Sequence, residues 1–275
     1  LGTLGAGVFA IVLPLLLHSV GFVSAYYIWT AFMIAGTILY FIISCNAYHF
    51  QFRKQGYSEE ASKAMAIEAG QELFPAGNMK QSLLLSARIP ETWILVIAYF
   101  VTFGGFMALT AWLPTYWQKA HGLSVTQAGL FTSVYDCLAA LLRIPGGNLA
   151  DKIGGLKVSL FAISLLGTVA AVMAFSSNLA VSGLCTLIIA VAFGLNNAAI
   201  MKLVPVYVSK SVGGASGWVG GLGAFGGFVI PPVLGKVVDT MGTTGYYRGF
   251  LIFSLFSVIV MLILYFGLVV RNKNK

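Results

Sequence analysis

The stretch from Gly213 to Lys236 reads GGASGWVGGLGAFGGFVIPPVLGK and carries no charge before Lys236. An apolar segment of about 20 residues is long enough for an α-helix to cross about 30 Å of hydrocarbon. A helix is required there because lipid offers no hydrogen-bond partner to backbone amides. The stretch therefore predicts a membrane-spanning helix, and its glycines allow close contact with neighbouring helices.

Seven further apolar stretches of similar length predict a polytopic membrane protein. Of the 275 residues, 59% are hydrophobic and only 9% are charged, whereas about a quarter of the residues of a soluble domain are charged. The alternating strands of a membrane barrel are absent from the sequence. We therefore predict an all-α transmembrane bundle with about eight spans, the other seven being Gly2–Leu17, Phe22–Ala47, Thr92–Trp117, Val125–Ala150, Leu156–Phe175, Ala180–Val206 and Tyr247–Val270.

The net charge of +8 is explained by membrane topology, because the basic residues are distributed unequally between the two sides of the predicted bundle. If the first span runs outward from the cytoplasm, the cytoplasmic side holds Arg53, Lys54, Lys63, Lys80, Arg88, Lys152, Lys157, Lys202, Lys210, Arg271, Lys273 and Lys275. The outer side then holds Lys119, Lys236 and Arg248. An excess of Lys and Arg on the cytoplasmic side is the usual topology signal. We expect a multi-pass plasma-membrane protein with a cytoplasmic C-terminus and no nucleic-acid partner.

One long polar connector, from His49 to Pro90, separates the second and third predicted spans. Within it, Ser58 is placed to cap a short helix over Glu59–Leu73. That helix is expected to lie along the cytoplasmic membrane surface, and a solvated linker is an equally good interpretation.

Two glycine-rich stretches form an internal repeat. Gly2–Pro14 reads GTLGAGVFAIVLP and Gly220–Pro232 reads GGLGAFGGFVIPP. They lie in the first and seventh spans, an offset of six, and parallel six-helix repeats are one way in which transporters are built. The chain also begins at Leu1 inside an apolar segment, without an initiator Met. We therefore expect a fragment from which four preceding spans are missing.

The glycines of the seventh span define one face of a helix. Gly213, Gly217, Gly220, Ala224 and Gly227 recur at spacings of four and three. A face without large side chains lets a neighbouring helix or a small ligand approach the backbone. Tight helix packing is the favoured interpretation, and bending or sliding of helices during transport is compatible with it.

Arg143 is a basic residue inside a predicted span. A guanidinium is costly in lipid, so it is expected to face the bundle interior or a water-filled path. Its planar donors suit a flat oxyanion such as nitrate, or a carboxylate. The alternative is that Arg143 extends its side chain to the cytoplasmic headgroups.

Three further residues are candidates for the same site. Tyr99 and Phe103 are one turn apart in the third span and can form an aromatic wall beside a planar ion or guanidinium. As a structural alternative, they are ordinary core or lipid-facing residues. Asp136 lies seven residues before Arg143, on nearly the same helix face. It is a candidate proton carrier or, equally, a candidate charge partner of Arg143.

The stretch Gly147–Lys157, GNLADKIGGLK, resembles the cytoplasmic loop signature of the major facilitator superfamily, with Gly147, Asp151, Lys152 and Gly154 in its pattern. Gly155 stands where that pattern usually has a basic residue. GWVGGLGAFGGF at Gly217–Phe228 resembles the second glycine signature of the nitrate/nitrite porters, and Gly2–Pro14 resembles the first. Arg143 in LLRIPGG is similar to the arginine of their eighth helix, and Tyr99 and Phe103 to the aromatic pair of their seventh.

The resemblance implies a partial fold of this superfamily, helices five to twelve of twelve. Residues 1–48 would then be the last two helices of the N-terminal half, residues 49–90 the cytoplasmic central loop, and residues 91–275 the C-terminal six-helix half. It implies substrate contacts by Arg143, Tyr99, Phe103, Thr3 and Gly220, and close packing or gating by Gly2, Gly5, Gly217, Gly223 and Gly227. Thr3 stands where the family commonly has Asn, and Gly220 where some members have Ser, so selectivity between nitrate and nitrite is left open.

The implied function is secondary transport of nitrate and nitrite by alternating access, through nitrate/nitrite exchange or proton-coupled nitrate uptake. The partners would be the two anions and the lipid bilayer, for a protein that is monomeric at full length. We expect no enzymatic activity, cofactor or metal. Alternatives are a superfamily transporter of organic anions or drugs, a membrane enzyme or redox subunit, and a structural subunit. His18, His49 and His121 lie at span ends, which argues against haem ligation.

Overall fold

Helices make up the regular structure of the computed structural model, which describes residues 4–71 and 79–270. Seven helical segments of this described part are long and apolar enough to cross a membrane. They are Gly7–Ile43, Pro90–His121, Val125–Ile153, Gly155–Ala174, Leu179–Tyr207, Ser209–Met241 and Thr243–Val270. The predicted all-α, multi-pass class is confirmed.

The first two predicted spans are joined in a single element, which accounts for seven segments where about eight were expected. Helix α1 (Leu4–Ile43) runs through both of them. Inside it, Gly21 has φ 76° and ψ 172°, so two helices meet there across a kink. Glycine adopts this backbone conformation at little cost because it has no Cβ. The predicted break between the spans is thus a one-residue kink and not a loop.

The chain divides into two compact units. Among the described residues, the first unit contains residues 4–15 and 79–270, and the second contains residues 16–71. Gly2 and Thr3 of the predicted site lie outside the described residues.

The second unit holds the rest of α1, α2 (Tyr48–Lys54) and α3 (Glu59–Glu68). The Ser58 hydroxyl accepts a hydrogen bond from the amide of Ala61 at 3.2 Å, as the predicted cap requires. Helix α3 ends at Glu68, short of the predicted Leu73, because Gly70 takes a positive φ of 86° two residues later. Leu73 itself lies outside the described residues.

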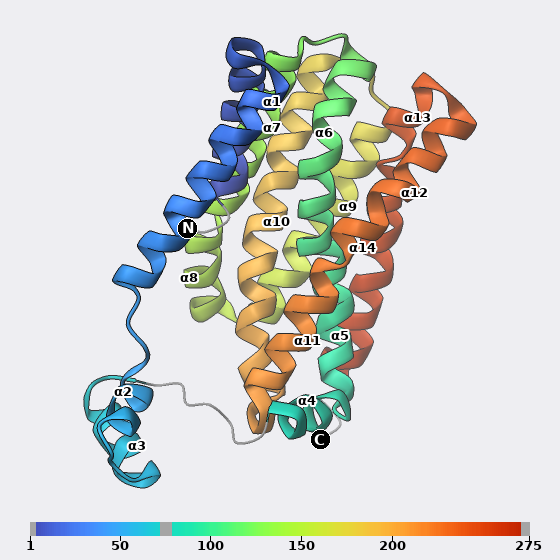
Figure 1. Cartoon of the computed structure of the whole chain (residues 1–275). Helices are drawn as coiled ribbons and strands as arrows, with labels where there is room; N and C mark the ends of the chain where they lie inside the picture. Colours follow the sequence, from blue (N-terminus) through green and yellow to red (C-terminus); the bar gives the residue numbers. More distant parts are fainter. Residues whose placement is uncertain (1–3, 72–78, 271–275) are drawn as a thin grey trace. The chain divides into compact units, whose positions relative to one another are not determined.

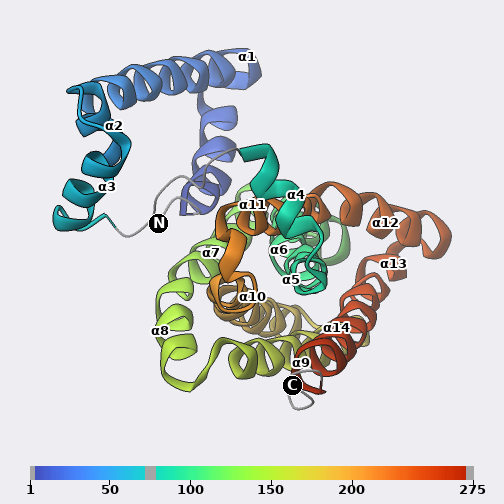
Figure 2. The ribbon, with the colours of Figure 1, turned by 90° about the horizontal axis from the view of Figure 1, so that it is seen from below.

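The first unit is a bundle in which α10 contacts α5, α7, α8 and α9. Figures 1 and 2 show these elements around α10 in two views. Two predicted spans are broken, after α7 at Leu142 and after α11 at Phe225. The elements are α4 (Met79–Ala87), α5 (Pro90–Tyr99), the π-helical turn η1 (Phe100–Gly104), α6 (Gly105–His121), α7 (Val125–Leu141), α8 (Arg143–Ile153), α9 (Gly155–Ala174), α10 (Leu179–Tyr207), the 3-10 turn η2 (Ser209–Ser211), α11 (Val212–Ala224), α12 (Gly226–Met241), α13 (Thr243–Arg248), α14 (Leu251–Leu264) and the π-helical turn η3 (Tyr265–Val270).

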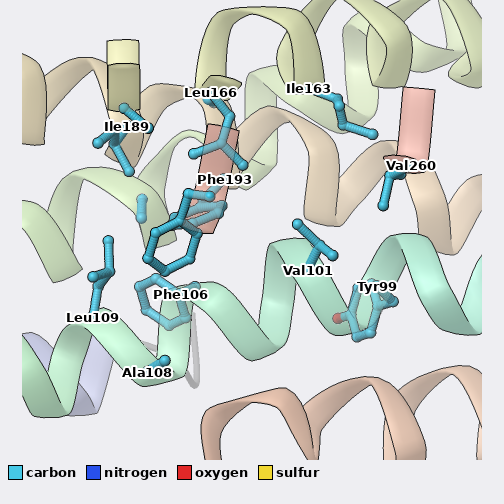
Figure 3. Packing of buried hydrophobic residues seen from close by; sticks show 14 of the residues in the cluster. Tyr99, Val101, Phe106, Ala108, Leu109, Ile163, Leu166, Ile189, Phe193 and Val260 are labelled. Carbon is cyan, nitrogen blue, oxygen red and sulfur yellow. The ribbon is translucent and has the colours of Figure 1, made fainter. Parts of the chain in front are cut away.

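The core of the bundle lies between the α5–α6 span and helices α9, α10 and α14. Figure 3 shows Val101, Phe106 and Leu109 of the α5–α6 span facing Ile163, Leu166, Ile189, Phe193 and Val260. Each of these side chains is buried. The α5–α6 span is therefore held rigidly on one side by apolar packing.

Helix α4 is fastened to the start of α11 by hydrogen bonds. The Ser82 hydroxyl accepts from the amide of Gly214 at 3.1 Å, and the Ser211 hydroxyl donates to the Ser82 carbonyl at 2.7 Å. The Trp218 indole donates to the Leu83 carbonyl at 3.0 Å. Ser211, which precedes α11, makes no side-chain cap of its own. Ser82 therefore caps α11 from a different helix.

Candidate functional site

Arg143 begins α8, directly after the break at Leu142 in the fourth predicted span. Its side chain is half-buried, and Nη2 donates a hydrogen bond to the Tyr99 hydroxyl at 3.4 Å. The guanidinium carbon lies 5.6 Å from the centre of the Phe103 ring. Three residues predicted for one site are thus neighbours, although 44 positions separate Tyr99 from Arg143 in the chain.

Tyr99 and Phe103 present stacked rings to this guanidinium. Their centroids are 4.9 Å apart and the ring planes differ by 17°. Tyr99 is the last residue of α5, and Phe103 lies in the π-helical turn η1. Turns of this kind inside helices are frequent at functional sites, and nothing in the residue pattern had predicted one here.

The aromatic stacking continues away from Arg143. Phe103 stacks on Phe106 at 6.2 Å, and Phe106 on Tyr135 of α7 at 5.7 Å. The Tyr135 hydroxyl donates to the Phe106 carbonyl at 3.2 Å. A line of rings therefore connects the guanidinium to the interior of α7.

The charge of Arg143 is not neutralised within the described chain. The ion pair found in this part of the protein joins Lys202 to Asp151, and Arg143 donates to a neutral hydroxyl instead. No ion pair joins Asp136 to Arg143 among the described residues, and Oδ1 of Asp136 is hydrogen-bonded to the Thr110 hydroxyl at 2.6 Å. A half-buried cation with remaining donors and an aromatic wall can bind a small flat anion.

Glycines on α11 and α12 let these helices approach the aromatic pair. A Cβ built on Gly223 would lie 2.6 Å from Cδ1 of Tyr99. A Cβ on Gly104 would lie 2.6 Å from the Cα of Gly226, and one on Gly227 would lie 2.7 Å from the Cβ of Met107. The helices cross here with almost no space between their backbones.

Of the glycines on the predicted face of this span, Gly227 makes such a close contact, but Gly213, Gly217 and Gly220 do not. Gly213 and Gly217 are exposed, and among the described neighbouring helices a Cβ on Gly217 would meet only Leu83, at 3.5 Å. A Cβ on Gly220 would meet only Met201, at 3.9 Å. Periodicity finds a small-residue stripe, but it does not say which stripe faces the neighbouring helix. Gly5 of α1 is also exposed, with no atom of the described chain within 4 Å of a Cβ there.

The residues of the loop signature lie at the end of α8. Asp151 accepts from the Lys202 ammonium of α10 at 2.6 and 2.7 Å. Gly147, one turn before Asp151, lies beside the Lys202 stem, and a Cβ there would be in ordinary contact with its Cε atom at 3.8 Å. Lys152 is exposed, and Gly154 ends α8 with a positive φ of 95°. The signature therefore ties α8 to α10.

The sequence interpretation missed three partners of these residues. Thr110 binds Asp136, Lys202 binds Asp151, and Gly226 faces Gly104. Lys202, a lone lysine in an apolar span, carried a signal, because an intramembrane charge calls for a partner. Thr110 carried none.

Comparison with known proteins finds relatives that match part of this chain. The chain is 37% identical over 162 residues to the "Nitrite extrusion protein" of Bacillus subtilis (strain 168), covering 59% of this chain and 40% of the relative. It is 34% identical over 170 residues to the "Probable nitrate/nitrite antiporter NarK1" of Thermus thermophilus, covering 55% of this chain and 38% of the relative. It is 33% identical over 174 residues to the "Probable nitrate transporter NarT" of Staphylococcus haemolyticus (strain JCSC1435), covering 62% and 44%. The matches thus span less than half the length of each of these relatives.

The fold and the family model agree with these relatives. A bacterial homologue of the human lysosomal transporter Spinster, in an inward-facing and occupied conformation, superposes with a TM-score of 0.51 at 16% identity. The superposition covers 66% of this chain and 49% of that one. The model of the Major Facilitator Superfamily matches residues 1–231 and, in a second match, residues 119–275. The chain belongs to the Major Facilitator Superfamily.

Proposed function

We propose that the protein is a secondary transporter of nitrate and nitrite that works by alternating access. Arg143 is the anion-binding residue, and Tyr99 and Phe103 form the wall against which the anion lies. The observation that carries the proposal is the uncompensated guanidinium of Arg143, held by the Tyr99 hydroxyl and facing the Phe103 ring. Relatives named as nitrate and nitrite transporters, at 33–37% identity, support the choice of substrate.

The chemistry of the site favours a small flat anion over other substrates. A guanidinium offers parallel donors that match the oxygens of a planar oxyanion. The ring of Phe103 can stack on the flat face of that anion or of the guanidinium. The close approach of Gly223 to Tyr99 leaves little room behind the wall for a bulky substrate.

Transport requires that the helices around Arg143 move relative to one another. Anion binding would neutralise the charge that otherwise opposes closure of the site. The glycine contacts between α11–α12 and the α5–α6 span permit sliding because few side chains interlock there. Nitrate/nitrite exchange and proton-coupled nitrate uptake are both compatible with this site.

The placement of the protein in the cell follows from charge and hydropathy. We infer a plasma-membrane location with a cytoplasmic C-terminus, because the basic residues concentrate on one predicted side. Residues 1–48 belong in this proposal to the N-terminal half of the transporter, residues 49–90 to the central loop and residues 91–275 to the C-terminal half. The working form is a monomer in the lipid bilayer.

The deciding experiment is Arg143→Lys in the whole protein, with uptake of labelled nitrate as the measurement. Lysine keeps the charge but loses the planar pair of donors. A lost hydrogen bond to a charged group is worth about 1.5–3 kcal/mol, so we expect about tenfold or greater loss of apparent nitrate affinity. The matched control is Arg248→Lys, whose guanidinium lies 4.2 Å from the Phe175 ring, away from this site. Nitrate uptake by Arg143→Lys equal to that of the control contradicts the proposal, and inhibition by bulky carboxylates favours an organic-anion transporter.

A further inference from the structure

Asp136 is the one acidic side chain in the described chain that is fully buried in a membrane-spanning segment. It lies in α7, and its exposed fraction is 0%. Among the residues 4–71 and 79–270, its Oδ2 atom has no hydrogen-bond partner, and its Oδ1 atom has only the Thr110 hydroxyl of α6, at 2.6 Å. An ionised carboxylate has about four acceptor sites to fill, so this surrounding fits the charged form poorly.

Cations do not offset that charge in the described structure. Arg143, two turns along the same span, donates to Tyr99, and Lys202 of the adjacent α10 is paired with Asp151. The titratable neighbours on α7 itself are Tyr135 and Cys137, and neither side chain can carry a positive charge. Helix α6 faces Asp136 with Thr110, and α1 faces it with the backbone of Gly7.

The hydrogen-bond inventory of Thr110 points to the neutral form of Asp136. The Thr110 hydroxyl lies 3.0 Å from the Phe106 carbonyl, one turn back on its own helix, and 2.6 Å from Asp136. A hydroxyl has one proton to donate and two lone pairs that accept. Thr110 is within donating distance of both acceptors but has a proton for only one of them. A carboxyl protonated on Oδ1 removes this competition, because it donates to Thr110 while Thr110 donates to the Phe106 carbonyl. A protonated carboxyl needs a single acceptor, and Thr110 provides it.

We propose that Asp136 is a proton-binding site, protonated in the conformation described here, which takes up and releases its proton as the bundle changes conformation. The site has a lid, because the first segment of α1 covers Asp136 through a glycine. The Gly7 carbonyl accepts from the Ser133 hydroxyl at 2.6 Å, and a Cβ on Gly7 would lie 3.3 Å from the Cβ of Asp136. Movement of α1 away from α7 would open the carboxyl to water and allow the proton to leave.

A path of contacts connects this proton site to Arg143. The Phe106 carbonyl accepts from Thr110 and from Tyr135, the neighbour of Asp136. The Phe106 ring stacks on Phe103, the ring nearest the guanidinium. Loss of the proton from Asp136 would therefore reorganise the helix turn that supports the anion wall. This coupling rests on the proposed transport function, whereas the proton site itself does not.

The test measures the proton directly, in the 275-residue chain reconstituted in lipid bilayers. A protonated carboxyl gives an infrared C=O stretching band that ionised carboxylates lack. At neutral pH we expect this band in the wild type, a shift of it in heavy water, and its loss in Asp136→Asn. Asp239→Asn, which removes an exposed carboxyl, is the control and should leave the band unchanged. A wild type without the band, or with a band that survives in folded Asp136→Asn, overturns the proposal.

A second variant decides the matter if Asp136→Asn does not fold. Thr110→Val keeps the acid and the side-chain shape but removes the acceptor, so the band should move to higher frequency. A band at an unchanged frequency contradicts the proposed bond to Thr110. In the whole protein, loss of the response of nitrate uptake to a pH gradient in Asp136→Asn supports the coupling, and a preserved response refutes it. Absence of nitrate transport by the wild type would contradict the proposed function and leave the infrared result standing.

Discussion

Gly223 lies against the ring of Tyr99 so closely that a Cβ at position 223 would be 2.6 Å from Cδ1 and 3.0 Å from Cβ of that tyrosine. The hydroxyl of the same tyrosine receives the hydrogen bond from Arg143. A glycine on α11 therefore sets the position of the ring that holds the guanidinium. The glycine signature and the arginine, far apart in the sequence, act on one side chain.

Gly223→Ala should displace Tyr99 and weaken anion binding. The added methyl would lie 3.0 Å from Cβ of Tyr99 as well as 2.6 Å from its ring, so rotation of the ring alone does not relieve the contact. Overpacking of this kind costs about 1–3 kcal/mol. Both the thermal stability in detergent and the apparent nitrate affinity should fall. Gly221→Ala on the same helix is the control, because no atom of the described chain lies within 4 Å of a Cβ there. Equal thermal stability and equal nitrate affinity of the two variants would show that Gly223 does not position Tyr99.

Tyr99→Phe removes the hydroxyl bound to Arg143 and retains the ring. A hydrogen bond that involves a charged group contributes about 1.5–3 kcal/mol, and this one is long at 3.4 Å. Nitrate affinity should therefore fall about two- to tenfold. The stacking of the ring on Phe103 should persist, and thermal stability should change little. Nitrate uptake kinetics provide the measurement, with Tyr265→Phe at an exposed position as the control. An unchanged affinity would mean that Tyr99 does not orient the guanidinium.

Ser82→Ala should destabilise the attachment of α4 to α11. Loss of a capping side chain costs about 0.5–2 kcal/mol, and here the Gly214 amide loses its acceptor. The free energy of unfolding, measured by denaturant titration in micelles, should decrease by this amount. Ser216→Ala on α11, a serine without a hydrogen bond in the described structure, should have almost no effect. A stability loss in the control as large as in Ser82→Ala would refute capping between the two helices.

The ion pair of Asp151 and Lys202 should contribute little to stability. The two side chains are 56% and 48% exposed, although their closest atoms are 2.6 Å apart. Exposed pairs typically contribute about 0.2–1 kcal/mol because solvent and salt screen them. A double-mutant cycle with Asp151→Asn and Lys202→Gln should return a coupling energy in that range, which decreases at high salt. A coupling energy well above it would show that the pair is shielded from solvent.

Composition alone was sufficient to predict the class of the protein. Lipid excludes unpaired backbone amides, so a chain with 59% hydrophobic residues in long uncharged runs is confined to helices, and the structure has them. The kink at Gly21 and the π-helical turn at Phe100–Gly104 were not predicted. Both are local departures from a helix that apolar periodicity does not encode. The end of α3 at Glu68 was missed because a glycine with positive φ, not the polar pattern, stops the helix.

By itself, the sequence determined the helical class and named Arg143, Tyr99 and Phe103, because a buried charge and an i,i+4 aromatic pair are visible in one dimension. Only the tertiary structure decided which groups meet: Gly223 with Tyr99, Thr110 with Asp136, and Lys202 with Asp151. The physical reason is that small residues and hydroxyls act at the place where two helices cross. The rotation of each helix about its own axis determines which residues lie at the crossing, and this rotation cannot be read from the residue spacing within a single helix.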